Sequence, residues 1–244
     1  MCGRYSQKYT GRKLGVHYKV TNRAFEFPPN LNVCPTQLAP VVVAGESGPE
    51  LRTMKWGLIP PWAKSVKDGL RAINAKAETL DEKPTFKSSF KNKRIIVPAN
   101  SFFEWREEEE VHHLTKKERA EYPKGTYAVT TGRIFKQAYQ FTVNGQLIFS
   151  LAGLYSIWKS PEGQEIESFT IITTEPNELM APYHNRMPVI ILPENERLWI
   201  DPAFTNPVLL KGLLKPYPSD KMTVEIFEKK AAHSIPVKKS TDAA

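Results

Sequence analysis

Cysteine is scarce in this sequence, and long apolar runs are absent from it. Cys2 and Cys34 are the two cysteines among 244 residues, a pair too sparse to suggest the disulfide framework of a secreted scaffold. No stretch approaches the roughly 20 apolar residues that a membrane-spanning helix needs. The start of the chain is polar and lacks the apolar region of a signal peptide. We therefore expect a cytoplasmic protein that spans no membrane.

Metal-ligand patterns are missing as well. No further cysteine lies near Cys2 or Cys34 at the spacing of a zinc site. The histidines, among them His17, His112 and His113, form no convincing cluster with the cysteines. These absences predict that the protein binds no metal.

Acidic residues are outnumbered by basic ones. The chain has 34 Lys and Arg against 26 Asp and Glu, which gives a formal net charge of +8. A basic excess favours a polyanionic partner, most simply nucleic acid. The same excess also fits a soluble protein with a generally basic surface, so charge alone leaves both interpretations open.

The chain contains 20 prolines, and this frequency predicts short helices and strands. The mixed order of strands and helices predicts an α+β fold around a mixed, largely antiparallel, barrel-like sheet with short flanking helices. The Asn-Gly pair at 144–145 is a strong hairpin signal. Pro176, Pro193 and an Asn206 cap predict helices at residues 176–180, 194–200 and 207–214. β-Branched or aromatic segments bounded by turn residues predict strands at residues 41–44, 51–56, 95–98, 126–131, 147–155, 169–173, 189–192 and 223–227.

The chain shows no internal repeat and no linker long enough to divide it, so we expect one domain over residues 1–230. An acidic run at 107–110 and the charged segment after it predict a surface insert around residues 107–135. A solvated loop with a short helix is the simplest form of that insert. Residues 231–244 are small, polar and basic, and we expect them to form a flexible tail.

Cys2 follows the initiator methionine directly, and this position allows two chemistries. If Met1 stays, Cys2 is an ordinary thiol near a chain end. If Met1 is removed, Cys2 presents an α-amine and a thiol on neighbouring atoms. An α-amine has a pKa of about 7.7–8.0, so a sizeable fraction is neutral and nucleophilic at cytoplasmic pH.

Three further polar residues occur in apolar surroundings. Glu104 lies in Ser-Phe-Phe-Glu-Trp, where burial would raise its pKa and suit it to proton transfer, or where strand alternation would turn it to water. His184 can shuttle protons near neutral pH, or place a cation at a helix C-terminus without any catalysis. Asn74 could orient a reacting group or satisfy a turn.

Aromatic and basic residues offer contacts for nucleic acid. Trp62 follows two prolines, and an aromatic residue on a stiffened loop can stack on an unpaired base. Trp56, at a strand end, fits a core position better. Surface Lys and Arg are usually just solvated, but donors for phosphates are available from Arg4, Arg71, Lys76 and Arg186.

Six separated motifs occur in order along the chain: MCGRYS, NVCPTQ, WGLIPPWA, INAKAET, FFEW and HNRMP. Together they resemble the SRAP family (SOS response-associated peptidase domain), from Met1 to about Leu192. The resemblance implies a single-domain α+β fold with a positively charged groove for single-stranded DNA. It also implies recognition of abasic sites, where a base has been lost and the sugar can open to an aldehyde. Such a protein would act in the DNA damage response, on the nucleoid when bound to DNA.

The resemblance assigns residues as well. The family nucleophile matches Cys2. Lysine at position 76, where the family often has arginine, keeps the charge but loses the bidentate fork. The insert around 107–135 is longer than the family leads us to expect. The polar partners of the nucleophile match Asn74, Glu104 and His184, and the DNA-contacting positions match Arg4, Trp62, Lys76, Arg186 and, more weakly, Thr173.

This family function gives Cys2 a specific chemistry. Its amine would form a Schiff base with the opened sugar, and its thiol would then close a five-membered thiazolidine. Asn74 would hold the Cys2 amine or thiol, Glu104 would move protons at the amine and carbinolamine, and His184 would protonate the opening sugar oxygen. No metal or cofactor is required, and we expect a monomer. β-Elimination from the imine would be a lyase side reaction, and Met1 would leave by self-cleavage or through an aminopeptidase.

Two other functions stay open. A thiol (auto)peptidase would use Cys2 as nucleophile with His184 as base, but it leaves the basic charge and Trp62 unexplained. A non-catalytic single-stranded DNA-binding module explains the charge and the aromatics but not Cys2. Peptide turnover without a DNA adduct would favour the peptidase. An adduct with abasic DNA that survives denaturing electrophoresis would exclude the binding module.

Overall fold

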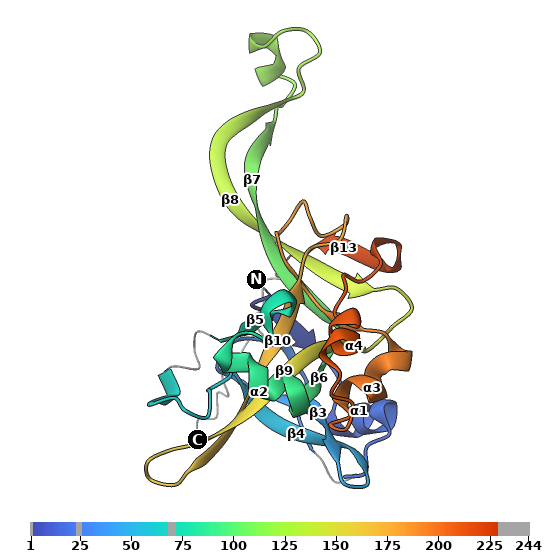
Figure 1. Ribbon diagram of the computed structural model, residues 1–244. Helices are drawn as coiled ribbons and strands as arrows, with labels where there is room; N and C mark the ends of the chain where they lie inside the picture. The colour runs from blue at the N-terminus through green and yellow to red at the C-terminus, as the bar shows by residue number, and fades with distance from the viewer. Residues whose placement is uncertain (1, 23–25, 68–71, 229–244) are drawn as a thin grey trace, which may run out of the picture.

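A closed five-stranded β-barrel forms the body of the protein (Figure 1). The computed structural model describes residues 2–22, 26–67 and 72–228. β10 pairs with β4 in parallel, and the remaining neighbours in the ring are antiparallel. Because β9 bonds to both β6 and β10, the ring closes on itself. The predicted α+β fold with a mixed, largely antiparallel, barrel-like sheet is confirmed. The barrel strands are β3 (Leu38–Gly45), β4 (Gly48–Trp56), β6 (Arg94–Ala99), β9 (Phe149–Lys159) and β10 (Glu165–Thr174).

Three short strands attach to this ring. β5 (Asn74–Lys76) runs parallel to the end of β10, and β11 (Met187–Pro188) lies antiparallel to the same end. β12 (Ile190–Ile191) pairs with β9. The end of β10 therefore gathers segments that are about a hundred positions apart in the sequence.

A second, wholly antiparallel sheet packs beside the barrel and extends into a projection. Its strands, in spatial order, are β13 (Met222–Ile226), β8 (Ala128–Val143), β7 (Ser101–His113), β1 (Tyr5–Gln7) and β2 (Asn30–Val33). Within the described residues, β7 after residue 106 and β8 before residue 137 pair only with each other. They form a projecting hairpin, here called the arm (residues 107–135), which carries η3 (Glu118–Glu121) near its tip (Figure 1).

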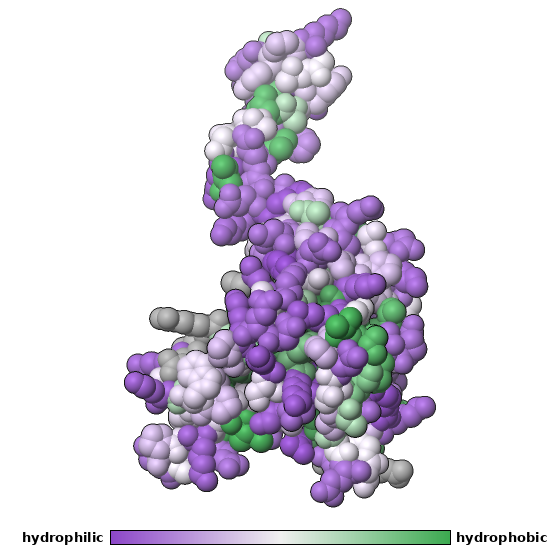
Figure 2. All heavy atoms as spheres, viewed as in Figure 1, coloured by the Kyte–Doolittle hydropathy of each residue, from purple (hydrophilic) through white to green (hydrophobic). Residues whose placement is uncertain are grey.

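The arm corrects the prediction of a solvated loop for the acidic run. Glu107 pairs across the ribbon with Lys136, and Glu108 with Phe135, so opposite charges and an aromatic ring support strand pairing. The short helix is present as η3. The surface of the arm is mostly hydrophilic, with an apolar band partway along it to which the exposed Val111, Ile134 and Phe135 contribute (Figure 2). Residues 231–244, the predicted tail, lie outside the described residues.

The Asn-Gly pair turns the chain but makes no hairpin. Gly145 has the positive φ of +73° that favours glycine. The strands before and after it belong to different sheets, because β8 pairs with β7 and β13 while β9 pairs with β6, β10 and β12. The hairpin prediction is therefore wrong: this turn carries the chain from the second sheet into the barrel.

Short helices cover part of the barrel, and two of the three predicted helices are confirmed. Asn206 caps α4 by accepting from the backbone N–H groups of Val208 and Leu209. The helix predicted at 176–180 is wrong, because residues 178–183 form only turns; Asn177 caps the first of them and donates its amide to Tyr217 O at 2.7 Å. α1 and α2 were not predicted. The helices are α1 (Gly11–Tyr18), α2 (Pro84–Asn92), α3 (Glu196–Ile200) and α4 (Pro207–Gly212), with 3-10 turns η2 (Ala77–Thr79), η4 (Pro193–Asn195) and η5 (Ser219–Lys221).

Strand alternation divides the core into two clusters. Val41 and Val43 pack in a cluster that includes Cys2, whereas Val42 between them packs with the helices. At Gly153 the ring is so tight that an added Cβ would lie 2.8 Å from Thr170 O and 2.9 Å from the Ile95 side chain. Closure at this point therefore requires glycine.

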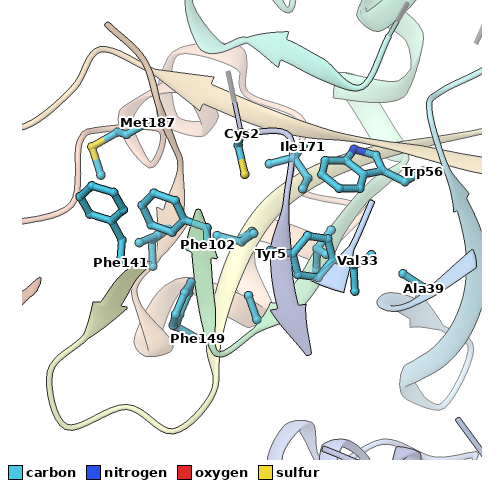
Figure 3. Packing of buried hydrophobic residues seen from close by; sticks show 14 of the residues in the cluster. Cys2, Tyr5, Val33, Ala39, Trp56, Phe102, Phe141, Phe149, Ile171 and Met187 are labelled. Carbon is cyan, nitrogen blue, oxygen red and sulfur yellow. The ribbon is translucent and has the colours of Figure 1, made fainter. Parts of the chain in front are cut away.

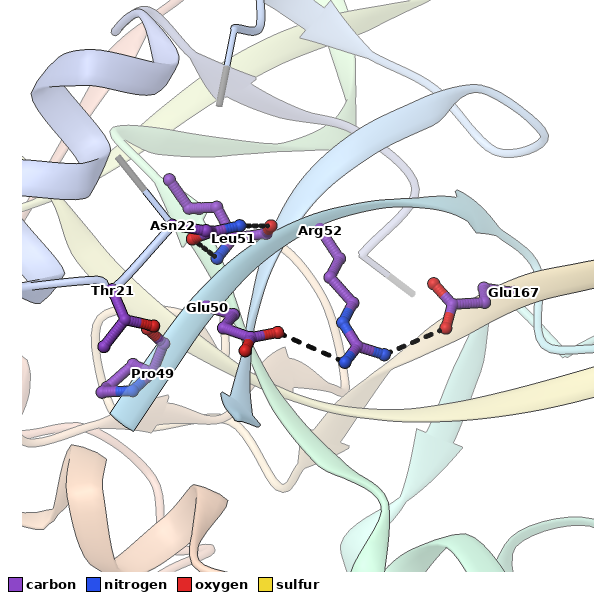
Figure 4. A network of polar contacts seen from close by, with 7 residues as sticks. All are labelled: Thr21, Asn22, Pro49, Glu50, Leu51, Arg52 and Glu167. Atoms are coloured by element: carbon purple, nitrogen blue, oxygen red, sulfur yellow. Dashed lines mark hydrogen bonds and ion pairs between the residues drawn. The ribbon is translucent and has the colours of Figure 1, made fainter. Parts of the chain in front are cut away.

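Polar contacts reinforce the parallel pair of the ring from outside (Figure 4). Arg52 on β4 bridges Glu50 at 3.3 Å and Glu167 of β10 at 3.2 Å. Asn22 binds both backbone groups of Leu51, donating at 2.6 Å and accepting at 2.9 Å. Because Arg52 is partly exposed, each of its ion pairs contributes at most about 1 kcal/mol.

Candidate active site

Cys2 lies just before β1 and is fully buried. Its thiol belongs to an apolar cluster with Tyr5, Phe102 and Met187 (Figure 3). Burial raises the pKa of the Cys2 thiol, and the neighbouring Glu104 carboxylate raises it further. Cys2 is therefore a protonated thiol close to a carboxylate.

Glu104 faces the same side of β7 as Phe102 and is 4% exposed. Burial raises its pKa to about 7. The alternative in which alternation turns Glu104 to water is wrong, because both faces of β7 are covered at this point. On the opposite face Phe103 packs against Phe227 with ring centroids 4.8 Å apart.

Asn74 begins β5 and stands in register with Ile171 of β10. Its amide nitrogen donates to Ile171 O at 3.4 Å. Within the described part of the chain its Oδ1 is buried and has no hydrogen-bond partner. The preceding residue is anchored by Trp56, whose indole donates to Ile73 O at 2.9 Å. Asn74 is therefore a fixed acceptor, suited to a ligand or to a group of the reacting chain.

His184 lies in the loop between β10 and β11, and its ring is fixed by its neighbour. The Arg186 backbone N–H donates to Nδ1 at 2.9 Å, and Nδ1 also lies 3.2 Å from Arg186 O. The shorter contact favours an accepting Nδ1, with the proton of the neutral imidazole on Nε2. Burial lowers the pKa of His184. The interpretation as a cation at a helix C-terminus is wrong, since no helix forms there.

The fold brings the four predicted catalytic residues to one region. The Glu104 carboxylate lies close enough to the Cys2 thiol to raise its pKa. Asn74 is bonded to Ile171, and His184 precedes Met187; both Ile171 and Met187 pack in the cluster that holds Cys2. The individual roles of these residues stay predictions.

The predicted DNA-contacting residues differ in how accessible they are. Trp62 is 63% exposed, whereas Trp56 is fully buried, as the sequence indicated. Lys76 follows Asn74 on β5 and is exposed. Arg4 is exposed and lies over the Trp105 ring, 5.3 Å from its centroid. These surfaces can stack on a base or bind a phosphate.

Two of the predicted contacts already have protein partners, and one cannot be placed. Thr173 is buried, and its hydroxyl donates to Ala75 O at 3.5 Å. Arg186 forms a bidentate pair with Glu78 at 2.8 and 2.9 Å. Arg71 lies outside the described residues.

Sequence reasoning missed Glu78 and an aromatic group at the base of the arm. Glu78 lies in the same INAKAET motif as Asn74, and that placement was the available signal. The Arg106 guanidinium lies 5.2 Å from the Tyr139 centroid and 4.9 Å from that of Tyr183. Because Tyr183 precedes His184, this stack connects the base of the arm to the His184 loop.

Two negative findings apply to the described residues. No helix among them is long and apolar enough to cross a membrane. In the same ranges, no three His, Cys, Asp or Glu side chains gather as a metal site would require.

Comparison with known proteins places the chain in a family. The SOS response associated peptidase (SRAP) model matches residues 1–231. "Abasic site processing protein YoqW" of Bacillus subtilis is 41% identical over 197 residues, covering 81% of this chain and 78% of that protein. "Abasic site processing protein HMCES" of Xenopus tropicalis is 30% identical over 194 residues, covering 72% and 55%. A crystal structure of a Bacteroides thetaiotaomicron protein is 27% identical, with a TM-score of 0.73 over 93% of each chain. This chain therefore belongs to the SRAP family.

Proposed function

We propose that this protein processes abasic sites in single-stranded DNA by covalent capture at Cys2 after Met1 is removed. Membership of the SRAP family and the names of the relatives support an abasic site as the substrate. The main support for the chemistry is that the buried Cys2 thiol lies beside Glu104. The pKa of Glu104, about 7, allows this carboxyl group both to accept and to donate a proton near neutral pH.

The reaction begins at the amine. Without Met1, the neutral α-amine of Cys2 attacks the sugar aldehyde to give a carbinolamine, and loss of water gives the imine. The thiol then adds to the imine carbon while its proton moves to the nitrogen, which closes a five-membered thiazolidine. The overall change is aldehyde plus aminothiol to thiazolidine plus water, so no oxidant or cofactor is consumed. Placement of both nucleophiles on one residue supplies a large proximity advantage.

The surrounding side chains have separable tasks in this scheme. Glu104 takes the proton from the attacking amine and returns it to the departing hydroxyl. Asn74, with a buried Oδ1 that has no partner among the described residues, accepts from the Cys2 amine or thiol. His184, with its proton on Nε2, protonates the sugar oxygen as the ring opens. β-Elimination from the imine is the competing lyase reaction, and thiazolidine closure suppresses it.

The electrostatics of Cys2 favour this order of events over thiolate chemistry. A cysteine peptidase needs a thiol with a lowered pKa, because the thiolate is the nucleophile. Here burial and Glu104 raise the pKa of the thiol. A thiol that adds to an imine already formed, beside the Glu104 base, does not need a lowered pKa.

DNA would reach this site along exposed basic and aromatic groups. The net charge of +8 attracts a polyanion. Trp62, at 63% exposure, offers a stacking surface for a base flanking the lesion, and Lys76 offers a phosphate contact on the strand that bears Asn74. Cytoplasmic location, with the protein on the nucleoid when DNA is bound, and a monomeric state are parts of the same proposal.

Intact-mass spectrometry tests the proposal. Purified protein is incubated with an abasic single-stranded oligonucleotide and with the intact oligonucleotide. We expect loss of Met1, and an adduct equal in mass to protein plus abasic strand minus one water, formed only with the lesion. Cys2→Ala should leave at most a reversible imine, and Cys34→Ala, the matched control at the other cysteine, should react normally. An adduct of equal stability from Cys2→Ala, or from protein that keeps Met1, would overturn the proposal.

A further inference from the structure

Glu78 and Arg186 form a two-pronged ion pair beside His184. The carboxylate oxygens of Glu78 accept from the two terminal nitrogens of Arg186 at 2.8 and 2.9 Å. The same guanidinium donates to Thr173 O at 2.6 Å. The Arg186 side chain is only 15% exposed. A bidentate pair of this kind fixes the geometry of both partners, so Arg186 is fastened both to η2 and to the end of β10.

Arg186 in turn sets the state of the His184 ring. Its backbone N–H lies 2.9 Å from Nδ1, closer than the 3.2 Å between Nδ1 and Arg186 O. The shorter contact favours an accepting Nδ1, which places the proton of the neutral ring on Nε2. A displaced Arg186 would release this hydrogen bond and allow the other tautomer. Burial lowers the pKa of His184, and the backbone hydrogen bond with Arg186 opposes this shift. The Arg186 charge, which the Glu78 carboxylate opposes, adds a smaller lowering.

Glu78 is itself held in place from two directions. It follows Asn74 by four residues, so β5 and η2 carry both side chains in one continuous segment. Lys211 of α4 donates to Glu78 O at 3.1 Å and pairs with Asp81 at 2.6 Å. Glu78 and Arg186 are 108 positions apart in the chain, and their ion pair links the segment that carries Asn74 to the loop that carries His184.

We propose that Glu78 is a positioning residue, which holds His184 in the Nε2–H form by clamping Arg186. The proposal rests on the proposed function, in which His184 delivers a proton from Nε2 to the opening sugar. Glu78 itself touches neither the sugar nor the nucleophile in this scheme.

Glu78→Gln tests the assignment, since it keeps the size of the side chain and removes its charge. Glu82→Gln is the matched control: it makes the same charge change four residues further on, at an exposed side chain. Nitrogen-15 NMR of histidine-labelled protein reads the His184 tautomer directly. Crosslinking rates at saturating abasic oligonucleotide are measured from about pH 5.5 to about pH 8, and affinity is measured with an intact strand.

In Glu78→Gln we expect the nitrogen-15 shifts of His184 to show a mixture of tautomers instead of the Nε2–H form alone. Crosslinking should be about fivefold slower at neutral pH, because a partly exposed ion pair contributes only modestly. The limb of its pH profile that reports His184 should move to lower pH, because Arg186 is no longer neutralised. Glu78→Asp should restore the profile, and Glu82→Gln should match wild type. Binding of the intact strand should not weaken.

Two results would overturn the role of Glu78, and a third would count against the proposed function alone. An unchanged tautomer together with an unchanged rate and pH profile in Glu78→Gln overturns the positioning role. Loss of DNA affinity with an unchanged rate at saturation also overturns it, because the ion pair would then serve DNA binding. If wild type forms no adduct at all, the proposed function fails, while the NMR comparison still decides whether Glu78 sets the His184 ring.

Discussion

Replacing Glu104 by glutamine should make the protein more stable in alkaline solution and less active. The pKa of Glu104 rises from 4.5 to about 7 in the folded chain, because the carboxylate is buried. At about 1.36 kcal/mol per pH unit, this rise corresponds to a cost of about 3 kcal/mol once the group is fully ionised.

The sign follows from proton binding. The folded state holds the Glu104 proton more tightly than the unfolded state does, so folding is favoured where the group is protonated in both. As pH rises from 4.5 toward about 7, the unfolded chain ionises first and the folded state loses its advantage. Above that window the full cost applies. The glutamine side chain of the variant cannot ionise and escapes this cost, whereas its own burial is equally unfavourable at every pH.

Urea unfolding of wild type and Glu104→Gln at about pH 5 and about pH 8 measures the effect. The variant should gain about 2 kcal/mol relative to wild type between the two conditions. Glu107→Gln, at an exposed position on the same strand, is the control and should show no such change. In parallel, adduct formation by Glu104→Gln should slow by about two orders of magnitude, as expected for loss of a general acid–base. A stability difference that does not vary with pH would refute the burial of an ionisable group at this position.

Three further changes probe the DNA surface and the barrel. Trp62→Ala should weaken binding of intact single-stranded DNA by about 1–3 kcal/mol in fluorescence anisotropy, with an unchanged Tm because the side chain is 63% exposed; unchanged affinity would exclude stacking. Lys76→Ala should lower the slope of log affinity against log salt by about 0.7 if it contacts one phosphate, and an unaltered slope would remove it from the interface. Gly153→Ala should lower the free energy of unfolding by about 1–3 kcal/mol in urea titrations, because its Cβ would meet Thr170 O at 2.8 Å; a neutral result would mean that the ring can widen.

The barrel strands could be predicted because they are buried on both faces. Val41–Val43 and residues 95–97 are continuous β-branched runs, and such runs are typical of strands with no solvent side. The arm could not, because glutamate has low strand propensity and the residues that stabilise 107–110 come from 131–136, on the returning strand. α1 was not predicted because it contains two glycines, which lower helix propensity, although Thr10 caps its first turn.

The candidate site was predictable only as a set of motifs. Cys2, Asn74, Glu104 and His184 each had an ordinary explanation, and family resemblance rather than spacing selected them. Burial of Glu104 depends on aromatic residues on both faces of β7, which alternation within one strand does not reveal. The pairing of Glu78 with Arg186 spans 108 positions and leaves no local pattern.

The narrowness of the ring at residue 153 has a consequence for the position of Asn74. β9 there touches β6 on one side and β10 on the other, and the residue that faces it on β10 is Ile171. The carbonyl of Ile171 is the one that holds the Asn74 amide. The close approach of β9 and β10 at Gly153 therefore fixes the backbone carbonyl that orients the Asn74 side chain.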